Sequence, residues 1–443
     1  MSTAGDKAGG KRLRDRSRPF LWGLVSQATS SATNFALSIV AAIALGPAGL
    51  GRVFIGFSFY LLVLGFQRGL IIDPLISRSS ALGADERDRA TRAALMTSIG
   101  WGAVCTVVAA TASLIRIGGI GDGLALFVPW VIPALLQDFW RVVLFREGRE
   151  AAAALNDASW AAAMGLSLPL AFLAGSPWMV VGTWGIGAVA GAILGFLQAR
   201  SRPAPPAVAL RWWRHEAWPF GRWLGAEGVV YAVGAHGLVF VLAVLLGTRP
   251  LGGLRAIQTI FAPLTLLGPA IALPGLPQLA RATASSSANA RKLALTLSGA
   301  ALVLTGGYVL LASVGGDDLI RLVFGEAFTG FAPLFWPIAI GQLMAATGLG
   351  FGLLLKAQRR GRALLWTRVV GSGLALVLAS VLALQSGVTG AAWGMAVGSA
   401  ANAVLVTLLG LGLLGSGGLR PRGPATEALP DALGVGDPAR PAG

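Results

Sequence analysis

Charged residues are scarce in this sequence. Only 12% of its 443 residues are Asp, Glu, Lys or Arg, about half of the roughly 25% that is typical of soluble domains. A chain with so few charges cannot cover a large wet surface, and its mean hydropathy is +0.71. The composition therefore excludes a soluble multidomain enzyme and indicates a protein whose main solvent is lipid.

Cysteine and histidine are also nearly missing. The single cysteine, Cys105, excludes an internal disulfide and a cysteine metal cluster. Two histidines, His215 and His236, leave little for a zinc site, and the sequence holds neither a complete GxxxxGK[ST] phosphate-binding motif nor HExxH. We therefore expect no metal, no cofactor and no ATP hydrolysis by this chain.

Long apolar stretches take up most of the chain. Each can cross about 30 Å of hydrocarbon as a helix that rises 1.5 Å per residue. They span residues 20–45, 53–76, 93–115, 123–145, 152–174, 178–198, 223–247, 257–280, 293–313, 333–355, 363–385 and 389–414. The first stretch exceeds the roughly 7–15 apolar residues of a signal peptide, so we expect it to be retained. The sequence predicts an all-α polytopic membrane protein with twelve transmembrane helices.

The basic residues fall mainly in alternate connections between these stretches. Of the 35 Lys and Arg, 29 lie in connections on the side of the N-terminus, and only Arg52, Arg116, Arg249, Arg255 and Arg321 lie in those on the other side. Because cytoplasmic connections are enriched in Lys and Arg, both termini are predicted to be cytoplasmic. A net charge of +16 would otherwise suggest nucleic acid as a partner; topology explains the charge instead, and we expect no nucleic acid.

Similar landmarks recur about 200 residues apart. Spans one and seven end in the related stretches 45–52 (LGPAGLGR) and 246–255 (LGTRPLGGLR), and spans six and twelve carry glycine at four-residue spacing. We therefore predict two six-helix bundles in the same orientation, a known transporter plan that holds substrate between the halves. The predicted parts are a basic cytoplasmic tail (1–19), an N-terminal bundle (20–198), a cytoplasmic linker (199–222), a C-terminal bundle (223–414) and a disordered cytoplasmic tail (415–443).

The linker interleaves tryptophan with arginine. Trp212, Trp213 and Trp218 alternate with Arg211 and Arg214. Such interleaving is also found in nucleic-acid sites, but beside a membrane it is typical of an amphipathic segment lying at the level of the headgroups. We favour the membrane interpretation.

Residues 26–51, 66–75 (FQRGLIIDPL) and 136–157 resemble the polysaccharide-flippase (O-antigen flippase-like) branch of the multidrug/oligosaccharidyl-lipid/polysaccharide exporter superfamily, especially its actinobacterial members. The second half is similar in pattern only. The resemblance implies a V-shaped pair of bundles, alternating between inward- and outward-open forms in the bacterial cell (inner or plasma) membrane. It also implies the cargo, a prenyl diphosphate or monophosphate bearing sugars, and suggests polysaccharide polymerase or glycosyltransferases as partners besides membrane lipids.

Arg68 is the charged residue that lies deepest in a predicted span. A charged side chain at mid-bilayer costs about 2.5–3.5 kcal/mol on insertion scales, so such residues are functional candidates. A guanidinium matches phosphate with two parallel hydrogen bonds, so Arg68 is a candidate for the diphosphate head. The alternative is a pair with a carboxylate that only locks two helices together. Asp73, five residues on, is an awkward partner because it lies about 140° around the helix axis.

Asp138 and Arg141 lie three residues apart on the fourth span and so share a helix face. They predict either a local ion pair that reaches the cytoplasmic interface or an inner gate that breaks during transport. Asp157 on the fifth span leaves the same two interpretations open.

His236 lies near the middle of the seventh span and Glu227 near its start. A histidine inside the membrane can couple transport to protons, or it can stay neutral and bind a neighbouring helix. Glu227 is a candidate cation or proton site, or it simply reaches water at the interface.

Other polar residues suggest the walls of a cavity. Gln27 and Asn34 belong to an unusually polar first span, and polar faces in lipid turn to a cavity or a neighbouring helix. Gln258 opens an eighth span that four prolines are expected to kink. We assign Arg68, Gln27, Asn34, Asp73 and Gln258 to the substrate cavity.

These observations predict a transporter that flips a lipid-linked saccharide from the inner to the outer leaflet by alternating access, for polysaccharide export. Two alternatives remain: an antiporter of drugs or organic cations from the same superfamily, and a membrane enzyme of polysaccharide assembly. The enzyme is disfavoured because the outward connections are too short for a catalytic domain, the longest running from about Val314 to Ala332. A cavity of net positive charge would favour the flippase and an acidic one the antiporter.

Overall fold

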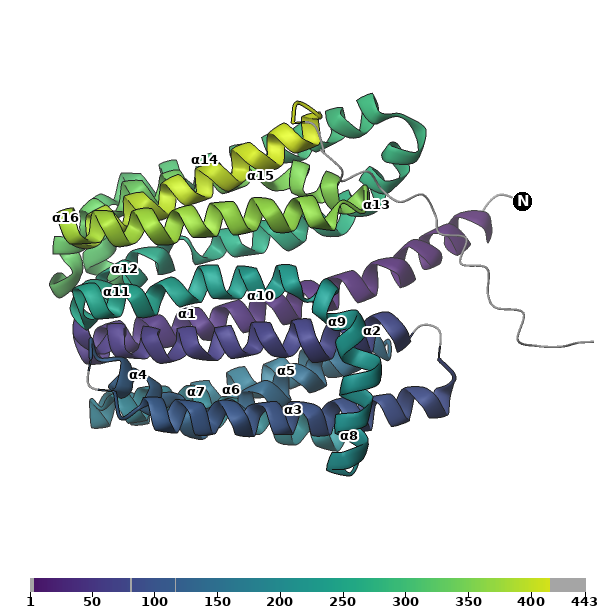
Figure 1. Cartoon of the computed structure of the whole chain (residues 1–443), viewed down its shortest axis with the longest axis horizontal. Coiled ribbons are helices and arrows are strands. Elements are labelled where there is room, and N and C mark those ends of the chain that lie inside the picture. Colours follow the sequence, from purple (N-terminus) through teal and green to yellow (C-terminus); the bar gives the residue numbers. More distant parts are fainter. Residues whose placement is uncertain (1–3, 80–81, 116, 415–443) are drawn as a thin grey trace, which may run out of the picture.

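The computed structural model describes residues 4–79, 82–115 and 117–414, and every regular element within them is a helix (Figure 1). The first group of helices comprises α1 (Ala4–Gln67), η1 (Arg68–Ile72), α2 (Asp73–Ser79), α3 (Ala84–Ala112), α4 (Ile120–Phe127), η2 (Val128–Trp130), α5 (Val131–Arg146), α6 (Glu150–Ala174) and α7 (Pro177–Ala199). A connecting segment follows, with α8 (Pro206–Trp212), η3 (Trp213–Ala217) and α9 (Trp218–Leu224). The second group comprises α10 (Ala226–Ala232), η4 (Val233–Gly237), α11 (Leu238–Leu246), α12 (Thr248–Ile260), η5 (Ala262–Leu266), α13 (Leu267–Ser285), α14 (Ser287–Phe324), η6 (Glu326–Leu334), α15 (Phe335–Ala357) and α16 (Gly361–Leu411).

The described chain crosses a membrane-sized layer twelve times. Nine helical stretches are long and apolar enough to do so, and α12 with η5 and α13 forms a tenth, bent by 57°. Three of the ten are interrupted by non-helical residues. The break in α14 at Gly316 lies eight residues from the end of that helix, too close for a further span, whereas those in α1 at Gly46 and in α16 at Ser386–Gly387 leave a full span on each side. An unbroken α16 of 51 residues would measure about 76 Å, more than twice the thickness of the hydrocarbon, and the chain reverses at the breaks in α1 and α16. The predicted all-α fold with twelve crossings is confirmed.

Glycine spacing explains how the two halves of α16 pack. A Cβ added to Gly394 would lie 2.3 Å from the Ala379 nitrogen, and one on Gly398 would lie 2.4 Å from the Ala375 Cβ. Small residues at four-residue spacing thus let the antiparallel segments approach closely. The bend between α12 and α13 confirms the kink expected from the prolines of the eighth span.

Three segments differ from the expectations or lie beyond the description. Helix α1 includes Ala4, so the described part of the predicted tail, residues 4–19, is continuous with the first span. The eighth crossing begins at Thr248 rather than at residue 257 because Gly247, with φ 78°, makes a tight turn directly after α11. The predicted disordered tail 415–443 lies outside the described residues.

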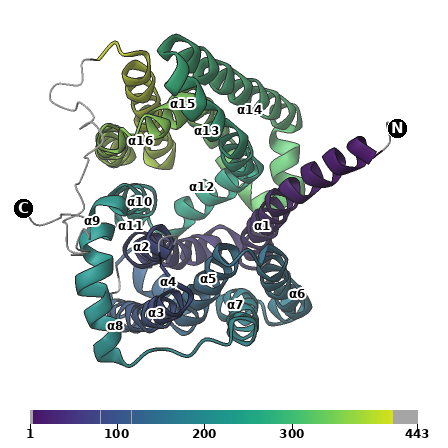
Figure 2. The same ribbon diagram turned by 90° about the vertical axis from the view of Figure 1, so that its right-hand side faces the viewer.

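The helix groups α1–α7 and α10–α16 stand side by side (Figure 2). We call the end where α1 begins, and where α8 lies across the spans, the proximal end, and the end with the turns at Gly46 and Gly247 the distal end (Figure 1). The two groups make their closest backbone contact at the distal end. A Cβ on Gly51 would lie 1.8 Å from the Thr248 carbonyl oxygen, and one on Gly252 would lie 1.8 Å from that of Pro47. The two stretches that resemble each other in sequence therefore pack against each other, with reciprocal contacts 201 residues apart.

Replacing Gly252 with alanine should weaken this distal contact. The added methyl group meets a backbone carbonyl that cannot rotate away, and overpacking of this kind costs about 1–3 kcal/mol, so the ratio of distal-open to distal-closed molecules should rise about 5- to 150-fold. Pulsed electron paramagnetic resonance between labels at Ala174→Cys and Gln385→Cys measures the change. Gly307→Ala is the control, because a Cβ there has open space; equal distances in both variants would contradict the prediction.

Candidate functional site

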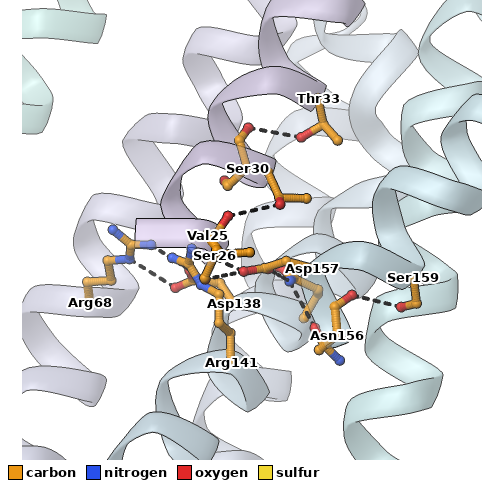
Figure 3. Close-up of polar contacts among 12 residues, drawn as sticks. Val25, Ser26, Ser30, Thr33, Arg68, Asp138, Arg141, Asn156, Asp157 and Ser159 are labelled. Carbon is orange, nitrogen blue, oxygen red and sulfur yellow. Dashed lines mark hydrogen bonds and ion pairs between the residues drawn. The ribbon is translucent and has the colours of Figure 1, made fainter. Parts of the chain in front are cut away.

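Two arginines and two aspartates from different spans meet inside the first helix group (Figure 3). Arg68 donates from Nε and Nη2 to the two carboxylate oxygens of Asp138, at 2.9 and 2.5 Å. Arg141 donates from Nη2 to Asp138 at 2.9 Å, and its Nη1 lies 4.0 Å from Asp157 Oδ2. Asp138 is only 3% exposed. Buried carboxylates of this kind are stable only when paired, and here each lies beside at least one arginine.

Neutral polar groups complete the coordination of Asp157. Gln137 donates from Nε2 to Asp157 at 2.8 Å and to Asn156 Oδ1 at 2.9 Å. Asn156 donates in turn to the Gly191 carbonyl oxygen at 2.6 Å, and the Ser26 hydroxyl donates to Asp157. The network therefore ties α1, α5, α6 and α7 together.

The local structure explains why these side chains converge. Arg68 opens the π-helical turn η1, whose extra residue redirects the side chains that follow; such turns often occur at functional sites. Gln67 fixes this turn against α5 by donating to the Leu135 carbonyl oxygen at 2.9 Å. On the other side, Gly191 admits Gln137, because a Cβ there would lie 2.6 Å from its Cγ.

A cavity of about 200 Å³ adjoins the network. Its walls are polar on the α1 side and charged on the α5 side, and they consist of Ser30, Thr33, Asn34, Tyr60, Leu61, Leu64, Arg68, Gln137, Asp138, Arg141, Asp157 and Trp160. The side chain of Arg68 is 42% exposed, whereas Asp138 is almost completely covered. Arg68 thus turns one edge to Asp138 and leaves its Nη1 group without a hydrogen bond to any residue that the structure describes.

Arg255 is a third embedded arginine, and its position corrects a prediction. Its sequence position suggested an outward connection, but it lies within α12 and its side chain points across to the first helix group. Its Nη2 donates to the Ser38 hydroxyl at 3.1 Å, and its guanidinium lies 5.2 and 5.6 Å from the ring centres of Phe54 and Phe57. No carboxylate in the described part of the chain pairs with it.

The second helix group adds two more groups that can carry positive charge. His236 lies in another π-helical turn, η4, is partly buried, and interacts electrostatically with Arg255. Arg368, on α16, lies 5.2 Å from the ring centre of Tyr231. Two of the predicted site residues, Arg68 and His236, therefore occupy π-helical turns on neighbouring spans.

The remaining predicted residues are placed as follows. Asn34 faces the cavity; Asp73 opens α2, partly buried, and Gln258 is partly buried on α12. Gln27 lies on α1 and Glu227 on α10, and the side chains of both lie outside the described residues. Reasoning from sequence missed Gln137, Tyr60 and Trp160 as cavity residues. Within the described ranges, no cluster of three His, Cys, Asp or Glu side chains that could hold a metal ion occurs.

No protein-family model matches the chain, and no curated sequence is detectably similar to it. Solved structures are similar in fold. An inward-facing multidrug-resistance transporter of the MATE family, in the MOP superfamily, matches with a TM-score of 0.67 at 12% identity, over 86% of this chain and 93% of that one. The lipid II flippase MurJ, in an inward closed conformation, matches with a TM-score of 0.68 at 12% identity, over 88% and 87%. A MOP superfamily transporter from Pyrococcus furiosus, described as having a binding pocket of reverse polarity, matches with a TM-score of 0.61 at 13% identity, over 88% and 93%. The chain thus has the fold of MOP superfamily transporters.

Proposed function

We propose that this chain is a transporter, not driven by ATP, that flips a prenyl-diphosphate- or prenyl-monophosphate-linked saccharide between the leaflets of a bacterial cell membrane. The observation that carries the proposal is the exposure of Arg68 to the cavity. Its guanidinium is 42% exposed there, whereas Asp138 and Asp157, the two aspartates that line the cavity, both lie beside arginine. Such a site favours an anionic head group over a cationic drug.

The Arg68–Asp138 pair suggests how the head group binds. Without substrate, Asp138 neutralises Arg68 and lowers the cost of holding a cation inside the membrane. Phosphate oxygens entering the cavity compete for the same guanidinium edge and for the open Nη1 group. Arg141 keeps Asp138 paired while Arg68 changes partner, because it already donates to that carboxylate at 2.9 Å. The hydroxyls and amides of α1 provide hydrogen bonds for sugars.

Orientation follows from the predicted distribution of basic residues. With the proximal end in the cytoplasm, the closed contact at Gly51 and Gly252 faces outward, and substrate enters from the inner leaflet. Export then requires the distal contact to open. It also requires Arg255 to break its hydrogen bond with Ser38 and its contacts with the rings of Phe54 and Phe57.

An antiporter of organic cations is the second candidate, and Asp73 favours it, since its partly buried carboxylate has no ion-pair partner among the described residues. Purified protein in vesicles distinguishes the two. We expect a fluorescent prenyl-diphosphate saccharide to become accessible to an impermeant quencher on the opposite leaflet, while ethidium and a neutral glycolipid with the same chain do not move. Transport of ethidium without the anionic lipid would reject the flippase in favour of the antiporter.

A further inference from the structure

An apolar groove lies outside the cavity, at the proximal end of the first helix group. It has a volume of about 430 Å³, within the roughly 300–1,000 Å³ of small-molecule sites. Its walls come from the second half of α1 with η1, from α3, and from α8 with η3. They consist of Phe66, Leu70, Ile71, Met96, Thr97, Gly100, Trp101, Val104, Pro206, Ala209, Leu210 and Trp213.

Two of the three polar side chains in these walls, Thr97 and Trp101, already have hydrogen-bond partners within the protein. Thr97 donates its hydroxyl to the Ala93 carbonyl oxygen at 2.9 Å, and Trp101 donates its indole N–H to that of Val63 at 3.1 Å. Leu210 and Val104 are each 56% exposed. The groove therefore offers apolar surface and calls for an apolar occupant.

One wall of the groove is a helix that lies across the spans. Figure 1 shows α8 running crosswise over α3 at the proximal end. The segment directly before α8 is held on α3 by two hydrogen bonds: the Ala204 amide donates to the Arg92 carbonyl oxygen at 3.0 Å, and the Arg92 side chain donates from Nε to the Arg202 carbonyl oxygen at 3.2 Å. One face of α8 is buried through Ala209 and Trp212. A crosswise position and a sequence that interleaves tryptophan with arginine are typical of a segment at the level of the lipid head groups.

Two exposed cations belong to the helical segment that forms one wall of the groove. Arg211 and Arg214 are exposed, are three residues apart on neighbouring positions of the helix surface, and follow Leu210 of the groove wall. Neither forms an ion pair with any side chain that the structure describes. An apolar groove and two unpaired guanidinium groups on the segment that forms its wall match the acyl chain and the phosphate that an anionic phospholipid combines in one molecule.

We propose that this groove is a binding site for an anionic phospholipid of the leaflet at the proximal end. One acyl chain lies between α3 and α8, against the stacked rings of Phe66 and Trp101, and the phosphate lies beside Arg211 and Arg214. The segment α8–α9 connects the two helix groups. The bound lipid therefore stabilises the docking of this segment on the first helix group at the proximal end. The site lies outside the transport cavity and stands whether or not the proposed cargo is right.

Native mass spectrometry of the full chain in detergent, titrated with phosphatidylglycerol or with phosphatidylcholine of the same acyl chains, tests the proposal. Wild-type protein should bind phosphatidylglycerol more tightly. The double variant Arg211→Gln/Arg214→Gln should lose roughly 10- to 30-fold in affinity for phosphatidylglycerol and little for phosphatidylcholine. Arg281→Gln/Arg362→Gln removes two exposed arginines of the second helix group and should bind both lipids like wild type.

Gly100→Leu tests the groove itself. A Cβ at Gly100 has open space, so the leucine fills the groove without a backbone clash, and affinity for both lipids should fall about tenfold or more. Gly165→Leu places the same side chain in open space on α6 and should change nothing. Equal binding by Gly100→Leu and Gly165→Leu would overturn the groove as the site. Equal loss of both lipids in the Arg211/Arg214 variant, or no preference for phosphatidylglycerol in wild type, would overturn the anionic assignment.

Discussion

Replacing Arg68 with alanine is expected to reduce translocation of the saccharide lipid at least about 100-fold, because two charge-assisted hydrogen bonds to the head group are lost. The variant should fold, since Asp138 keeps Arg141 as a partner at 2.9 Å. The measurement is the initial rate of quencher accessibility of the fluorescent prenyl-diphosphate saccharide in vesicles.

Two further variants make this result specific. Arg68→Lys keeps the charge and loses the bidentate geometry, so it should lie between wild type and alanine. Arg362→Ala removes an exposed arginine of the second helix group and should transport normally. A wild-type rate for Arg68→Ala in correctly folded protein would remove Arg68 from the substrate site.

Replacing Asp138 with alanine should cost about 3 kcal/mol in the free energy of unfolding, because breaking a buried ion pair leaves uncompensated charge. Arg68 would lose both of its carboxylate contacts, and Arg141 would keep only the 4.0 Å contact with Asp157. Reversible unfolding of the detergent-solubilised protein measures the loss.

A second substitution separates charge from packing in this result. Arg68→Met added to Asp138→Ala removes the stranded cation, so the double variant should recover much of the lost stability and the two changes should not add. Asp88→Ala breaks an exposed pair with Arg92 at 3.9 Å and should cost at most about 1 kcal/mol. If Asp88→Ala and Asp138→Ala lowered the free energy of unfolding equally, burial of the network would make no contribution to stability, contrary to the prediction.

The environment of the chain and its number of crossings could be predicted from the sequence. Hydropathy is a sum over neighbouring residues. An apolar stretch therefore predicts a span whichever helices that span packs against in the folded protein. The breaks at Gly46 and Ser386–Gly387 lie where short turns between spans were expected. The resemblance of residues 45–52 and 246–255 also had a physical counterpart, since Gly51 and Gly252 make reciprocal contacts.

The partners of the embedded charges could be predicted only in part. Asp138 and Arg141 share a helix face, which their spacing of three residues implies. The stronger partner of Asp138 is Arg68, 70 residues away, with two hydrogen bonds. Spacing within one helix carries no information about which face of another helix will meet it.

Arg255 illustrates the same limit from the other side. Its neighbours in sequence are glycine, proline and leucine beside a turn, and they predicted a connection. Packing instead continues α12 through this stretch and places the guanidinium over Phe54 and Phe57, contacts that join residues about 200 positions apart.

The sequence by itself thus determined that this protein is a membrane protein, that it is helical, how often it crosses, and that its basic residues gather in alternate connections, because these properties depend on local composition. Only the tertiary structure decided that Arg68 is paired and yet exposed to a cavity, that Arg255 of the second helix group contacts the first, and that α8 forms a wall of an apolar groove. Those features depend on the rotation of each helix about its axis and on its closest neighbours, which are set by packing among residues far apart in the chain.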